Sequence, residues 1–166
     1  MRNRHAVTVL TVLLLVMSLS ACGSVTATPV SQAPAPGPVD AKLFKIQPLA
    51  ILRSVPGGAA CVEGTLGGSS SSTGGNGTFH ALSDFTCQRV GNDREVYFAF
   101  ADAYAAALRT AGATVSGGWS SSGDATQPME QGWDVVGNTR AGAARLIAEN
   151  GVGTLRLFIS LDLRAP

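Results

Sequence analysis

One histidine, one serine and one carboxylate stand close together in the chain and could carry out hydrolytic chemistry. His80, Ser83 and Asp84 supply a proton acceptor, a hydroxyl nucleophile and a group that can orient the imidazole. A catalytic triad needs the three side chains to converge in space, and Ser83 lacks the Gly-x-Ser-x-Gly elbow that exposes such a nucleophile. Two interpretations stay open: a small hydrolase centred on His80, and a surface histidine near the start of a strand.

Acidic residues in the last third of the chain offer a second kind of chemistry. Asp134, Glu149 and Asp162 could face one another as the paired carboxylates of glycoside hydrolysis, or they could be scattered acids on a solvated sheet face. The sequence has no His-Glu-x-x-His, Cys-x-x-Cys or EF-hand spacing, and no phosphate loop or dinucleotide fingerprint. We therefore predict no metal, no cofactor and no enzymatic activity.

The N-terminus is organised like an export signal. Arg2 and Arg4 precede an apolar run over residues 6–19, which is shorter than the roughly 20 residues that span a bilayer. The run leads directly into Leu19-Ser20-Ala21-Cys22. An uncleaved anchor helix, or a plain secretory signal followed by an unrelated cysteine, is the alternative interpretation.

The tetrapeptide Leu19-Ser20-Ala21-Cys22 resembles the lipobox of bacterial lipoproteins, in which small residues precede a cysteine that receives a diacylglyceryl group. The resemblance covers about residues 1–24 and implies a mature chain that begins at a lipidated, palmitate-bearing Cys22. Two acyl chains suffice for stable anchoring. The expected location is therefore outside the cytoplasm, on a bacterial cell membrane, and the globular part is assigned to no family.

This organisation divides the chain into three parts: a signal peptide over residues 1–21, a lipidated and proline-rich tether over residues 22–41, and one domain over residues 42–166. Without the signal, ten basic and eleven acidic side chains remain, and the net charge is −1. Such a chain has no long-range attraction for nucleic acid. The expected partners are the membrane, through Cys22, and an envelope protein.

Two cysteines remain in the expected domain. Cys61 and Cys87 form an even pair in a chain that is expected to be exported, which favours a disulfide. A redox or metal-binding pair is the alternative, although no further cysteine or histidine cluster lies nearby.

The periodicity of the domain predicts an α+β fold in which one main helix, at about residues 92–111, packs on one face of an antiparallel sheet. Asn92 and Glu95 form a capping-box pattern at the helix start, and Gly112 is a natural stop. Strands are expected over residues 61–66 and 85–90, followed by a C-terminal three-strand meander over residues 133–136, 144–149 and 154–163. The segments 67–77 and 114–131 are expected to be loops.

Two arrangements of the last hairpin are compatible with a common core face. A two-residue turn at Asn150-Gly151 would place Arg145 opposite Arg156, a like-charge pair that sheets disfavour. We therefore favour a four-residue loop over 150–153, which pairs Arg145 with Phe158 and Glu149 with Thr154.

Two binding functions remain beside the enzyme hypothesis. The outward face of the last hairpin would carry Arg145, Ile147, Arg156 and Phe158, a mixture that is typical of partner interfaces, unless the segment with Trp119 covers it. The leading hypothesis is therefore a binding or assembly-support module. A small-ligand carrier, with a pocket between helix and sheet lined by Tyr97, Tyr104 and Trp133, is the other alternative.

Overall fold

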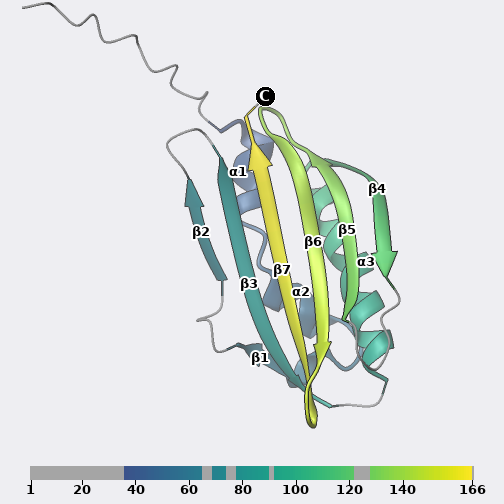
Figure 1. The fold of residues 1–166 in the computed structure, drawn as a ribbon. Coiled ribbons are helices and arrows are strands. Elements are labelled where there is room, and N and C mark those ends of the chain that lie inside the picture. Colours follow the sequence, from purple (N-terminus) through teal and green to yellow (C-terminus); the bar gives the residue numbers. More distant parts are fainter. Residues whose placement is uncertain (1–35, 65–68, 74–77, 90–91, 122–127, 166) are drawn as a thin grey trace, which may run out of the picture. The chain divides into compact units, whose positions relative to one another are not determined.

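A seven-stranded antiparallel sheet forms the body of the domain (Figure 1). The computed structural model describes residues 36–64, 69–73, 78–89, 92–121 and 128–165. The strand order is β1-β3-β7-β6-β5-β4, and β2 also pairs with β3. The strands are β1 (Cys61–Glu63), β2 (Ser69–Thr73), β3 (Phe79–Gln88), β4 (Thr114–Ser121), β5 (Met129–Val136), β6 (Ala141–Asn150) and β7 (Thr154–Arg164).

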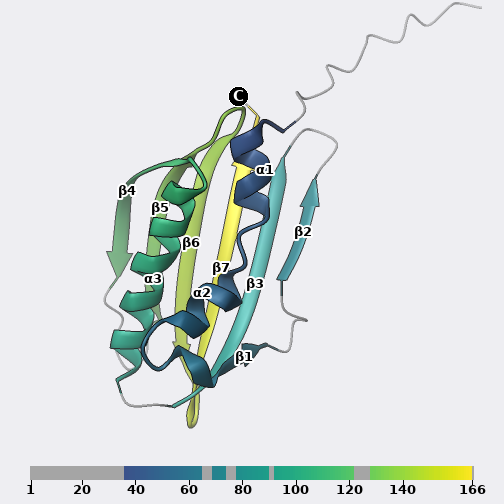
Figure 2. The same cartoon turned by 180° about the vertical axis from the view of Figure 1, so that it is seen from behind.

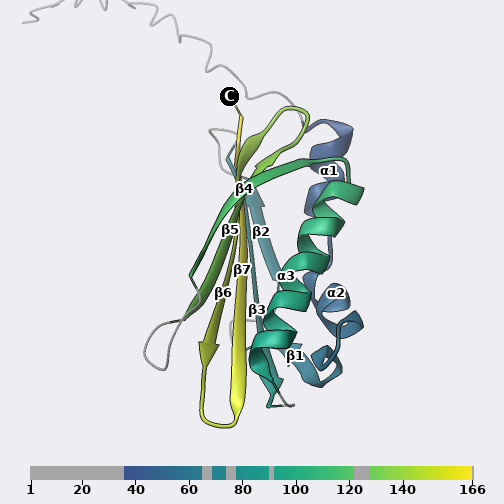
Figure 3. The ribbon, with the colours of Figure 1, turned by 90° about the vertical axis from the view of Figure 1, so that its right-hand side faces the viewer.

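Within the described residues, three α-helices lie on one face of this sheet: α1 (Pro38–Phe44), α2 (Pro48–Ser54) and α3 (Asp93–Thr110) (Figures 2 and 3). The α+β fold, its main helix and its C-terminal meander are confirmed. Asn92 caps α3 because its Oδ1 accepts a hydrogen bond from the Arg94 backbone N–H (3.1 Å). Gly112 ends the helix at a φ of 102°, a conformation that glycine adopts without strain.

The core lies between the helices and the sheet. Every second residue of β7, from Leu155 to Leu163, is buried, while its neighbours are only partly covered. This period of two is the pattern of a strand with one face on the core. From α3, Phe100 and Leu108 are fully buried against the sheet. The apolar faces of helix and strand thus stabilise each other.

The edge of the sheet beyond β3 differs from the sequence prediction. β1 and β2 pair with different parts of β3, so together they form one interrupted edge. The segment 67–77 was expected to be a loop because it has no core-forming side chain, yet residues 69–73 pair along their whole length with β3. Residues 67–68 and 74–77 lie outside the described part. Backbone hydrogen bonding at an edge requires no apolar side chains, which is why the expectation was wrong.

The segment 114–131 was also expected to be a loop, and here too the structure has strands. Thr114–Ser121 forms β4, the other edge of the sheet, and β5 begins at Met129. β4 is rich in glycine and serine, and the first half of β5 has Met129 as its one large apolar side chain, so apolar periodicity did not indicate either segment as a strand. β3 is also longer than expected, since it begins at Phe79.

The last hairpin has a third register that differs from both expected arrangements. Glu149 pairs with Arg156, and Arg145 pairs with Ser160. The turn between the strands is closed by a hydrogen bond from the Gly151 N–H to the Thr154 carbonyl (2.8 Å), with Gly153 at a φ of 70°. This register places opposite charges across from each other, which stabilises a sheet pair. The shift is an even number of residues, so the expected core face is unchanged.

The folded part of the chain begins before residue 42, within the segment expected to be a tether. Asp40 in α1 is fully buried and links the helix to the β5–β6 turn. Its carboxylate accepts hydrogen bonds from the N–H groups of Gly37, Asn138 and Thr139 (2.9–3.1 Å) and from the Thr139 hydroxyl (2.7 Å). These bonds hold α1 against the sheet.

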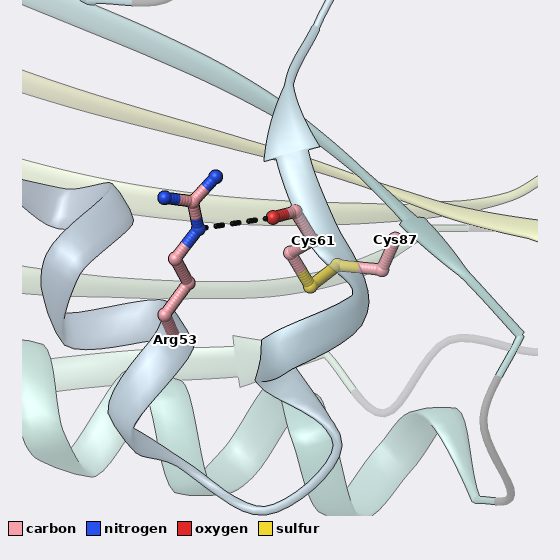
Figure 4. The surroundings of a disulfide bond; sticks show 3 residues. All are labelled: Arg53, Cys61 and Cys87. Carbon is pink, nitrogen blue, oxygen red and sulfur yellow. Dashed lines mark hydrogen bonds between the residues drawn. A yellow bond between two sulfur atoms is a disulfide. The ribbon is translucent and has the colours of Figure 1, made fainter.

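Cys61 and Cys87 are joined by a disulfide. They lie directly opposite each other in the β1–β3 pair. Beside the disulfide, the Nε of Arg53 in α2 donates a hydrogen bond to the Cys61 carbonyl (3.3 Å) (Figure 4). The disulfide and this hydrogen bond together tie α2, β1 and β3 at one end of the sheet.

Candidate binding face

The sheet face opposite the helices is the most prominent candidate site. In the part of the chain that the structure describes, no helix lies on this face (Figure 3). Sheets of this kind normally present a polar face to solvent. Here the open face instead carries a group of apolar, aromatic and arginine side chains, which we call the aromatic–arginine patch: Leu82, Trp119, Arg145, Ile147, Arg156 and Phe158.

Trp119 reaches this face because β4 contains a bulge. The β4–β5 register shifts by one residue between Ser116 and Trp119, where Gly117 and Gly118 have positive φ values of 62° and 129°. A one-residue shift exchanges the two faces of a strand. Without the bulge, Trp119 would point toward the helix side. With it, the indole lies over Gly132, where a Cβ atom would approach Trp119 Nε1 to 2.8 Å.

Arg145 lies at the centre of the patch and is fixed from two sides. Its guanidinium is 5.5 Å from the centroid of the Trp119 ring, a cation–π arrangement. Its Nη2 also forms an ion pair with Glu130 Oε1 (2.5 Å). Trp119 is itself half exposed, with 50% of its surface accessible to solvent. These interactions orient a cation and an aromatic ring that remain accessible to a partner.

The other expected interface residues lie beside this centre. Ile147 pairs with Phe158 across β6 and β7, so the two side chains are neighbours on the open face. The guanidinium of Arg156 lies 5.6 Å from the Phe158 ring centroid. The structure therefore brings together all four residues that the sequence placed on the outward face of this hairpin. The segment carrying Trp119 joins the patch at its β4 side.

A shallow hollow lies beside Trp119. Its volume is about 120 Å3, and it is lined in part by Gly132, Asp134 and Ala143. Small-molecule pockets usually have volumes of about 300–1,000 Å3. The hollow is therefore better suited to one side chain of a protein partner than to a whole small ligand.

The residues considered for hydrolysis do not converge. His80 is exposed on the face of β3 away from the helices. Asp84 is on the same face but is buried (2% exposed) against Gly64, and Ser83 is buried on the helix side. His80 instead pairs with Asp162 of the neighbouring strand β7, through Nδ1 and Oδ1. Because a strand places successive residues on opposite faces, Ser83 cannot meet the His80 imidazole in this fold.

The three acids considered for glycoside chemistry do not share one place on the sheet, because Glu149 lies apart from the other two. Asp134 and Asp162 flank Ala143 on the two strands beside β6. Glu149 is near the other end of β6, opposite Arg156. A paired arrangement of the three carboxylates is therefore not formed.

The residues suggested for a ligand pocket belong to the core. The Tyr97 hydroxyl donates a hydrogen bond to the Leu146 carbonyl (3.4 Å), and the Tyr104 and Trp133 rings pack with centroids 6.4 Å apart. Of these three residues, Tyr104 alone lines the large cavity on the helix side. That cavity lies under α1 and α2, which the sequence did not predict.

Comparisons with protein-family models, with curated proteins and with solved structures give no match to this chain. Among the described residues, no three His, Cys, Asp or Glu side chains form a group that could hold a metal ion. The helices of the described part are too short or too polar to cross a membrane.

Proposed function

We propose that this chain is a lipid-anchored envelope protein that binds another envelope protein through the open face of its sheet. The observation that carries the proposal is the aromatic–arginine patch, in which a glycine bulge turns Trp119 onto the face that carries Arg145 and Phe158. Tryptophan and arginine are enriched among the residues that dominate binding energy at interfaces.

The composition of the face supports a protein partner. Apolar and aromatic groups lie at its centre, while Asp134, Glu149 and Asp162 lie around it. This resembles the apolar core and polar rim of protein interfaces. The net charge of −1 expected for the mature chain supplies no strong attraction for a polyanion. Shape and side-chain chemistry, rather than long-range charge, would select the partner.

The membrane location in this proposal rests on the lipobox-like tetrapeptide Leu19-Ser20-Ala21-Cys22. We expect Cys22→Ala to move the protein from the membrane fraction to the soluble fraction, because the variant has no thiol to receive a diacylglyceryl group. Intact mass spectrometry of the native protein should show a diacylglyceryl mass on a chain that starts at Cys22. A native chain that retains residues 1–21, or that is unmodified at Cys22, would contradict the anchor.

The binding role predicts a specific loss when Trp119 is truncated. In native membranes treated with a chemical crosslinker, Trp119→Ala should lower the recovery of crosslinked partners at least about tenfold, as expected for a tryptophan that dominates the binding energy of an interface. The free energy of unfolding should fall by less than about 1 kcal/mol, because the indole is half exposed and its cation–π pair with Arg145 lies at the surface.

The matched control for this test is Phe98→Ala. Phe98 is an exposed aromatic residue on α3, 38% accessible, and it too lies near an arginine, with Arg94 5.4 Å from its ring centroid. Its truncation should leave the crosslinked partners unchanged. Equal recovery from the Trp119→Ala variant and the unmodified protein would rule out the patch as the binding surface.

A further inference from the structure

The helix side of the sheet contains a cavity that the proposed protein-binding function does not use. It has a volume of about 740 Å3 and lies between the α1–α2 segment and strands β3 and β7. This volume is within the range of about 300–1,000 Å3 that is usual for small-molecule sites. Because the cavity and the aromatic–arginine patch are on opposite faces of the sheet, the two sites are independent.

The cavity wall is polar and apolar in about equal parts, and the apolar part comes from both layers. Leu43, Ile46 and Leu49 contribute from the helices and the segment between them, and Ala81, Ile159 and Leu161 contribute from the sheet. Ala81 contributes only a methyl group to the wall, where the neighbouring strand contributes the larger side chains of Ile159 and Leu161. A ligand that fills this space therefore needs both an apolar body and polar groups.

One buried phenol lines the cavity. Tyr104 is 3% exposed, and within the described residues its hydroxyl has no hydrogen-bond partner. Because Tyr104 lines the cavity, its hydroxyl can donate a hydrogen bond to a ligand that supplies an acceptor. Burial raises the pKa of the Tyr104 phenol, which keeps it a neutral donor at physiological pH.

The entrance carries further donors. Lys45 and Arg53 line the cavity and are exposed. Arg53 uses its Nε to hold the Cys61 carbonyl, while its terminal nitrogens have no partner among the described residues (Figure 4). Glu63 is the one acid among the lining residues. Two cations against one acid give the entrance a net positive charge.

We propose that this cavity binds an amphiphilic carboxylate, with an apolar chain against the wall that includes Leu43 and Ile159 and an anionic head group near Lys45. The Tyr104 hydroxyl donates a hydrogen bond to an oxygen of the same carboxylate. The disulfide and the hydrogen bond between Arg53 and the Cys61 carbonyl hold α2 in place as one end of the site.

The test is isothermal titration calorimetry with sodium dodecanoate below its micelle concentration. The expected mature chain, residues 22–166 with Cys22→Ala, is the protein used, because without the lipid and the apolar run of residues 6–19 it needs no detergent that would compete for the cavity. We expect saturable binding of one dodecanoate per chain. Dodecan-1-ol, which has the same chain without the charge, should bind at least about tenfold more weakly.

Two mild variants locate the site. Tyr104→Phe removes only the hydroxyl and should weaken dodecanoate binding about tenfold, as for a hydrogen bond to a charged group. Lys45→Gln should also weaken it, whereas Arg109→Gln, at an exposed position of α3, should not. Absence of saturable binding, or an affinity unchanged in both Tyr104→Phe and Lys45→Gln, would overturn the proposal.

Discussion

Replacing Cys61 and Cys87 together by alanine is expected to lower the free energy of unfolding by about 3 kcal/mol. The two cysteines are 26 residues apart, and their bond closes a loop that includes β2 and β3 up to its next-to-last residue. Removing the bond gives the unfolded chain more conformations, and it also frees the short strand β1. Urea unfolding followed by the fluorescence of the buried Trp133 measures the change.

Reductant gives an independent check of this result. A reducing agent should destabilise the unmodified protein by the same amount and should leave the double variant unchanged. Val62→Ala is a suitable control because Val62 lies in the same strand but is 54% exposed. Its effect should stay within about 0.5 kcal/mol. A double variant as stable as the unmodified protein would show that the disulfide does not stabilise this fold.

Asp40→Ala is expected to cost about 3 kcal/mol, because it leaves the N–H groups of Gly37, Asn138 and Thr139 without their shared acceptor. The loss should appear as a lower urea midpoint at neutral pH. Asp102→Asn, at an exposed position of α3, is the control and should change stability by less than about 0.5 kcal/mol.

The Asp40 carboxylate should also make the free energy of unfolding depend on pH. Burial alone would raise the pKa of Asp40, but its hydrogen bonds outweigh burial and hold the pKa below the ordinary value of 3.8. Its stabilising contribution is therefore fully present above pH 3.8 and is lost as the pH falls through the lower, folded-state pKa. The stability difference between the unmodified protein and Asp40→Asn should be constant at neutral pH and should shrink in acid. A difference that grows in acid would contradict this assignment.

The parts of the fold that the sequence predicted are those with strong periodicity. β7 alternates over its whole length, and α3 has a capping residue, an apolar stripe and a glycine stop. In both elements the local preference and the core contacts agree. The placement of the four outward residues of the last hairpin on one sheet face follows from the same alternation. This placement was correct although the register was not, because an even shift preserves the faces.

The parts that were missed are held by backbone hydrogen bonds or by distant polar contacts. β2 and β4 are edge strands rich in serine and glycine, so no apolar pattern marks them. Trp119 joins the patch only through a bulge, and the signal that could have indicated it is the pair Gly117-Gly118 before the tryptophan. α1 depends on hydrogen bonds between Asp40 and residues nearly 100 positions away, which no local pattern contains.

The central claim is that the open sheet face binds a protein partner, and photo-crosslinking from that face tests it most directly. A p-benzoylphenylalanine introduced at Phe158 of the lipid-anchored protein would be irradiated in native membranes, and the same residue introduced at Phe98 of α3 would be the control. We predict a discrete protein adduct from position 158, absent from position 98 and abolished when Trp119→Ala is added. No adduct from position 158, or the same adducts from both positions, would contradict the claim.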